Sequence, residues 1–69
     1  MADKKVVTQG GGDNLFKVGE YNGTYYVSQV DPGFFGDSHK NIGETRSMKD
    51  ALDIIRSYSG KEIKSLSDW

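Results

Sequence analysis

The chemistry that this sequence offers centres on its single histidine, His39, a residue type that can bind a metal or act as an acid–base group. Asp31 and Asp37 lie close to it in the sequence. Aspartates in turn-forming stretches usually bond to nearby backbone amide groups, and protein zinc sites draw heavily on Cys and His. Because the chain has one His and no Cys, we predict no metal site and no cofactor.

No set of residues has the spacing of a catalytic site. A serine nucleophile would need His39 as its base, yet nothing in the sequence indicates a nucleophile elbow or an oxyanion hole for any of the serines. A chain of 69 residues also leaves little room for a substrate pocket of ~300 Å³ or more. We therefore predict that the protein is not an enzyme. An enzyme subunit whose site depends on His39 and is completed only in an oligomer is a third hypothesis.

Aromatic residues are the candidates for binding a partner, because a few rings in desolvated pockets supply most of the energy of many protein interfaces. The predicted partner-binding residues are Tyr21, Tyr26, Phe34, Phe35 and Trp69. Phe34 and Phe35 lie in DPGFFGDS, residues 31–38, a stretch of turn formers that we expect to be a loop. One of these two rings should point inward and the other outward, because adjacent residues of an extended chain point in opposite directions.

These residues also have a purely structural explanation. Tyrosine is a good strand former whose hydroxyl tolerates water, so Tyr21 and Tyr26 do not require a partner. In a chain that is short of core residues, one phenylalanine of the pair could pack beneath a helix, and Trp69 could seal the end of a sheet. The sequence leaves both explanations open.

Nucleic-acid binding is the alternative to protein binding. The chain offers the kinds of group that stack on bases and contact phosphates, namely Tyr21, Tyr26, Phe34 and Phe35 together with Lys17, Lys40 and Arg46. The chain lacks an aromatic RNP1-type strand, a GXXG loop and a basic recognition helix. Its net charge of −1 gives no general attraction to a phosphate backbone. Binding of single-stranded nucleic acid on a tyrosine face is therefore the less favoured hypothesis.

Two strand-like runs flank Asn22-Gly23, the preferred pair for a two-residue type I′ hairpin turn. This turn fixes a register in which Tyr21 faces Thr24 and Leu15 faces Val30. Side chains alternate between two faces, and the better core face collects Phe16, Val18, Tyr25 and Val27. The other face collects Leu15, Lys17, Tyr21, Tyr26, Ser28 and Val30. We expect that second face to be uncovered and amphipathic, which makes it a candidate docking surface.

The rest of the chain supplies a third strand, a helix and a last strand. HKNIGET, residues 39–45, is the expected third strand, in which Gly43 permits a bulge or a close approach. Ser47 as N-cap and Gly60 as the terminating glycine predict a helix from Met48 to Ser59. The apolar stripe of this helix consists of Met48, Ala51, Leu52, Ile55 and Tyr58. Residues 61–69 fit a helical turn or a strand, and we prefer the strand.

We expect residues 1–14 to form a flexible N-terminal arm and residues 15–69 to form a single α+β domain. The glycine triplet of residues 10–12 favours a linker, because a phosphate-binding loop would need a Lys-Ser/Thr pair and a helix after it. KVVT, residues 5–8, is a candidate edge strand. The expected fold is a small antiparallel sheet, a hairpin plus one or two further strands, covered on one face by a single helix in the order β-β-β-α-β.

Composition and the lack of apolar segments limit the classes of function that we expect. The absence of cysteine excludes disulfides and favours a reducing compartment. The N-terminal stretch lacks the apolar core of a signal peptide, and no run approaches the ~20 residues that span a bilayer. We therefore expect a cytoplasmic, non-enzymatic protein–protein interaction module that binds another protein or a second copy of itself and does not bind a membrane.

Overall fold

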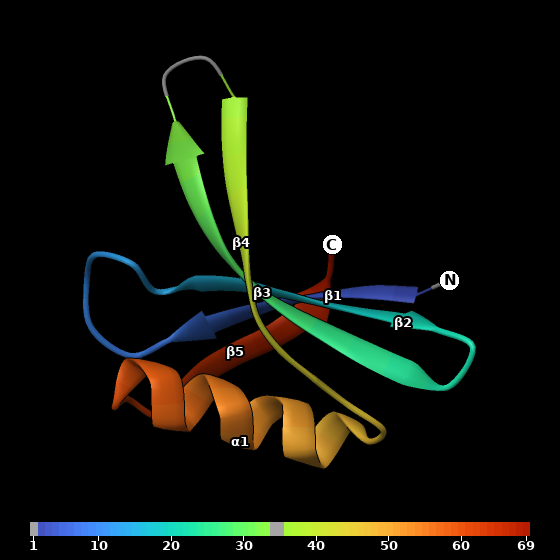
Figure 1. Cartoon of the computed structure of the whole chain (residues 1–69). Coiled ribbons are helices and arrows are strands. Elements are labelled where there is room, and N and C mark those ends of the chain that lie inside the picture. The colour runs from blue at the N-terminus through green and yellow to red at the C-terminus, as the bar shows by residue number, and fades with distance from the viewer. Residues whose placement is uncertain (1, 34–35) are drawn as a thin grey trace.

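The computed structural model describes residues 2–33 and 36–69, which form a single sheet with one helix on one of its faces (Figure 1). The elements are β1 (Ala2–Thr8), β2 (Leu15–Tyr21), β3 (Thr24–Gly33), β4 (Gly36–Thr45), α1 (Met48–Ser59) and β5 (Ile63–Asp68). The five strands lie in the order β4-β3-β2-β1-β5, and every neighbouring pair is antiparallel. The predicted α+β class is confirmed. The predicted order β-β-β-α-β and the small sheet are wrong, because four strands precede the helix and the sheet has five.

The segment Ala2–Thr8, which the sequence analysis assigned to an N-terminal arm, forms β1 between β2 and β5. Val6 pairs with Phe16 of β2 on one side and with Leu66 of β5 on the other, and its side chain is fully buried. Thr8 is also fully buried. A strand with neighbours on both sides satisfies its backbone groups in two ladders, so this lysine-rich segment belongs to the interior of the sheet.

The β2–β3 hairpin forms as predicted. Asn22 and Gly23 have φ values of 51° and 82°, and the amide of Gly23 donates to the Glu20 carboxylate at 2.8 Å. Two positive φ values are the signature of a type I′ turn, which Asn and Gly tolerate. The observed pairs run from Tyr21 with Thr24 to Phe16 with Gln29. The expected core face is confirmed, since Phe16, Val18 and Val27 are all buried and Tyr25 packs beside them.

The turn-forming stretch of residues 31–38 belongs to strands in its described residues. β3 extends to Gly33 and β4 begins at Gly36, so the loop expected over residues 31–38 is corrected to the end of a long hairpin that rises from the body of the sheet (Figure 1). We call residues 28–33 and 36–41 the β3–β4 arm. The expectations for Phe34 and Phe35 lie outside the described residues.

The expected third strand, residues 39–45, lies within β4 and carries a bulge at Ile42. The register shifts there, because Gly43 pairs with Val27 whereas Asn41 pairs with the next residue, Ser28. A Cβ on Gly43 would lie 3.2 Å from side-chain atoms of Ile54 in α1. The glycine therefore allows the close approach of helix and strand that the sequence predicted.

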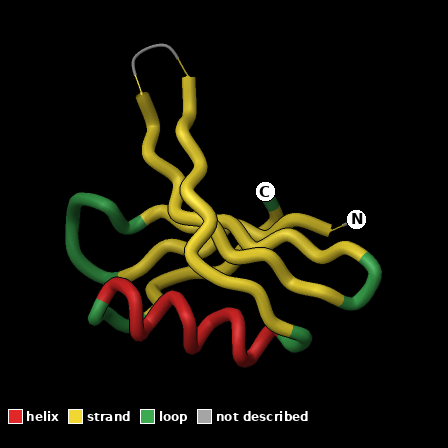
Figure 2. Tube along the Cα trace, in the orientation of Figure 1, coloured by secondary structure: helices red, strands yellow, loops and turns green. Residues whose placement is uncertain are grey.

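The helix begins and ends where its capping residues predict. The Ser47 hydroxyl accepts a hydrogen bond from the amide of Asp50 at 3.1 Å, and Gly60 adopts the left-handed conformation at φ 70°. Ala51 and Ile55 are fully buried against the sheet. The ring of Tyr58 meets that of Phe16 edge-on at 6.2 Å. After the helix the chain returns as β5, as preferred, and Figure 2 shows α1 alone on its side of the sheet.

The placement of β1 predicts a difference between two neighbouring valines. Val6→Ala should lower the free energy of unfolding by about 2 kcal/mol, because it removes buried methyl groups and leaves a cavity. Val7→Ala is the matched control, since Val7 is half-buried on the other face of the same strand, and it should cost less. Urea unfolding followed by circular dichroism measures both. An unchanged stability of the Val6 variant would contradict a packed β1.

Candidate protein-binding surface

The sheet has a second face, on the side away from α1, that we call the open face. Strand alternation assigns residues to it, because the neighbours of the buried Val6, Phe16 and Val27 must point the opposite way. The open face carries Asp3, Lys5, Val7, Leu15, Lys17, Tyr21, Tyr26, Ser28 and Val30. Its hairpin residues are those that the sequence placed opposite the core.

Tyr21 and Tyr26 are exposed on the open face, with 55% and 39% of their surfaces accessible. Tyr26 pairs with Gly19 of β2 and with Glu44 of β4. Gly19 provides no side chain there, and the Asp3 carboxylate from β1 lies 2.9 Å from the position that a Cβ on Gly19 would take. The tyrosine ring is therefore bordered by a glycine and two carboxylates rather than covered.

Trp69 continues from β5 onto the same face. Its amide donates to the Asp3 carbonyl at 3.1 Å, which aligns it with Asp3, Gly19 and Tyr26 in one row across the sheet. The Lys17 ammonium lies 5.1 Å from the centroid of the indole ring, within the range of a cation–π contact. Trp69 is 46% exposed. The structure thus brings Trp69 to the face that carries Tyr21 and Tyr26.

The open face is partly covered by the β3–β4 arm. The ring centroids of His39 in β4 and Trp69 after β5 are 6.1 Å apart, although β4 and β5 are opposite edges of the sheet. Four strand spacings would separate these edges by roughly 19 Å in a flat sheet, so the sheet must curl strongly. Val30, which pairs with His39, is 1% exposed. The expectation of a wholly uncovered face is therefore wrong at this end.

The face carries charges of both signs. Lys5 and Lys17 are directly opposite each other on the adjacent strands β1 and β2, an arrangement that costs stability when nothing compensates it. Lys17 is compensated by Asp3, at 3.6 Å between Nζ and Oδ2. The sequence did not indicate Asp3 or Lys5 as part of this surface, because their position depends on the pairing of β1.

Comparison with known protein families, with curated proteins and with solved structures finds no match for this chain. Within residues 2–33 and 36–69, no three or more acidic or histidine side chains gather as a metal site would require. In the same residues, α1 is too short and too polar to cross a membrane.

Asp68, beside Trp69, should show a pKa below its ordinary value. The Lys4 ammonium donates a hydrogen bond to its carboxylate and also attracts its negative charge, and both effects lower the pKa of Asp68. A lowered pKa means that the ion pair stabilises the fold above the ordinary pKa of aspartate, and that this stability is lost as the pH falls through the lowered value. Lys4→Met should return the pKa of Asp68 toward normal in an NMR titration, and Lys49→Met is the control. An equal pKa in all three proteins would contradict the ion pair.

Removal of the indole ring should loosen the arm. Trp69→Ala takes away the contact with His39, so amide hydrogen exchange in residues 36–41 should speed up by on the order of tenfold. Tyr21→Ala removes an exposed ring of the same face that lies beside the β2–β3 turn, away from the arm, and it should leave these rates unchanged. Exchange rates that do not respond to Trp69→Ala would show that the contact does not hold the arm.

Proposed function

We propose that this protein is a non-enzymatic protein–protein interaction module, whose partner is another protein or a second copy of the same chain. The binding surface is the open face, with Tyr21, Tyr26 and Trp69 as its anchors, and Phe34 and Phe35, which lie outside the described residues, stay candidates. One observation carries the proposal: three exposed aromatic rings lie on the face that α1 leaves uncovered.

The anchors are of the kind that stabilises interfaces. A tyrosine or tryptophan can bury roughly 150–250 Å², and a stable interface buries about 800 Å² on each partner. Tyr21 and Tyr26 each have an apolar ring and a hydroxyl, so they tolerate water before binding and exclude it afterwards. Three such rings can therefore form much of the central contact of an interface of ordinary size.

The charges around the anchors favour a protein over a polyanion. Asp3 and Glu44 border Tyr26, and a phosphate backbone laid along this row would meet both carboxylates. A protein surface can present charges of either sign in register. A second copy does so by symmetry, because its Asp3 and Glu44 can face Lys5 and Lys17 of the first copy.

A second candidate function, binding of single-stranded nucleic acid, is favoured by one observation. Lys5 and Lys17 form a cationic pair beside the indole of Trp69, which is the combination of phosphate contact and stacking platform that such proteins use. The two functions differ in their response to salt, because phosphate binding releases counterions and weakens steeply as salt rises.

The first test is the solution mass of the protein. Light scattering over a tenfold concentration range should show a dimer that persists at high salt, and Tyr26→Ala should convert it to a monomer because the buried ring is lost. Tyr58→Ala is the matched control, since Tyr58 is equally exposed but lies on α1. Circular dichroism confirms that both variants are folded. A monomeric wild-type protein in every condition would contradict self-association and leave another protein as the partner.

Fluorescence of Trp69, the only tryptophan, tests the alternative. Titration with a single-stranded oligonucleotide should leave the emission unchanged if the face binds protein. A saturable change that disappears at high salt and in the Lys5→Met variant would contradict the protein-binding proposal and support the nucleic-acid alternative.

A further inference from the structure

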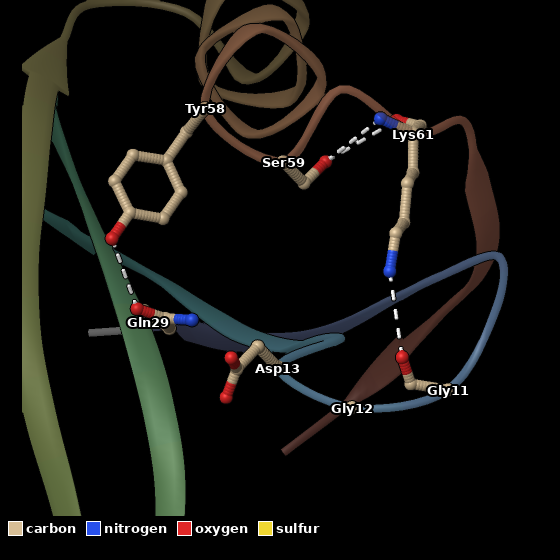
Figure 3. A pocket seen from close by; sticks show the side chains of 7 residues that line it. All are labelled: Gly11, Gly12, Asp13, Gln29, Tyr58, Ser59 and Lys61. Carbon is tan, nitrogen blue, oxygen red and sulfur yellow. Dashed lines mark hydrogen bonds between the residues drawn. The ribbon is translucent and has the colours of Figure 1, made fainter.

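A polar hollow lies on the other side of the sheet, where the β1–β2 loop approaches the last turn of α1 (Figure 3). Its volume is about 570 Å³, so the expectation that the chain has little room for a pocket is wrong. The walls are formed by the loop residues 11–13, by Gln29 of β3, and by Tyr58, Ser59 and Lys61 at the end of the helix. None of these residues belongs to the aromatic surface of the open face.

Two opposite charges line this hollow without pairing with each other. Asp13 contributes a carboxylate from the loop, and Lys61 contributes an ammonium from the segment after α1. No ion pair joins them among the described residues. In Figure 3, Asp13 lies beside Gln29 at one end of the hollow, whereas Lys61 stands at the other end above Gly11. A pocket with a separated positive and negative group complements a molecule that carries both charges.

Hydrogen bonds orient two of the polar side chains that line the hollow, those of Gln29 and Lys61. The Tyr58 hydroxyl donates to Oε1 of Gln29 at 3.1 Å, which turns the Nε2 group of that amide toward Asp13 and the floor of the hollow (Figure 3). The Lys61 ammonium donates to the Gly11 carbonyl over a long 3.4 Å, so two of its three hydrogens stay available. The Lys61 ammonium suits a carboxylate, and the Asp13 carboxylate at the other end suits an ammonium.

Hydrogen bonds within the protein fix the backbone segments that surround the hollow. The side chain of Asn14 donates to the Gly10 carbonyl at 3.1 Å, and the amide of Gln9 donates to the Glu62 carbonyl at 2.9 Å. Ser59 accepts from the amide of Lys61 at 3.1 Å. These bonds tie the glycine-rich loop to the segment after the helix, so the backbone around the hollow is held in place independently of binding.

We propose that this hollow binds a small zwitterion of the α-amino-acid class. Lys61 holds its carboxylate at one end of the hollow, and Asp13 holds its ammonium group at the other end. The ring of Tyr58 provides a wall for the side chain of the bound molecule. This site is independent of the protein-binding function proposed above.

Titration of the ¹⁵N-labelled full chain followed by NMR tests the proposal. The probes are glycine, L-serine and L-glutamine, each added to about 10 mM, which covers the Kd of about 1 mM that a few charge-assisted hydrogen bonds give. At least one of them should shift the amides of Gly11, Gly12 and Lys61 saturably. Acetate and methylammonium, which carry a single charge, should bind at least about tenfold more weakly.

Two variants should each weaken the binding by about tenfold, because each removes one charged contact. Asp13→Asn keeps the backbone, since Asp13 has a φ of 51° and asparagine tolerates that conformation. Lys61→Met keeps the aliphatic chain. Asp31→Asn and Lys49→Met are matched controls on exposed residues elsewhere and should bind like the unaltered protein. The proposal is overturned if no amino acid causes a saturable shift, if acetate alone binds equally well, or if the two variants bind as the controls do.

Discussion

The packing of Val6 against Phe16 in the middle of the sheet is the interaction on which the rest of the structure depends. It holds β1 between β2 and β5, and both side chains are fully buried beneath α1. Because β1 is in place, β5 has a strand to pair with, and the pairing delivers Trp69 to the open face. Trp69 then contacts His39 of the arm, beside which Val30 is buried. One apolar contact on the helix side thus determines the arrangement of aromatic residues on the other side.

Local signals made much of this fold predictable. The Asn22-Gly23 turn specified the register of the β2–β3 hairpin, and Ser47 and Gly60 specified both ends of the helix, because each of these residues acts on its immediate neighbours. β1 was harder, since its few apolar residues follow lysines and its partners are distant in sequence. Asp31 and Gly33 indicate a turn by type, yet they continue β3, where pairing with β4 overrides local preference.

The candidate sites were also predictable to different degrees, depending on whether their residues are placed by close neighbours or by distant segments of the chain. Tyr21 and Tyr26 share a face because a hairpin register fixes them, so their exposure could be anticipated. The position of Trp69 beside Lys17 depends on strand pairing across the whole chain. The hollow could not be predicted either, because it joins a loop near residue 12 to the end of a helix near residue 60. Strand alternation in β3 then places Gln29 in the hollow and Val30 on the open face.

The pairing of the first strand with the last has a consequence for the order of folding. Lys4 meets Asp68 across 64 residues, so the ladder between β1 and β5 closes the longest loop of the described chain. Closing so long a loop costs more chain entropy than closing a hairpin, and structures rich in such distant contacts fold slowly. During synthesis on the ribosome, β1 can pair with β2 early but keeps one edge unpaired until β5 has emerged. The nascent chain therefore exposes one unpaired edge of β1 until β5 emerges, and pairing with β5 then makes the short β5 the edge of the sheet in place of β1.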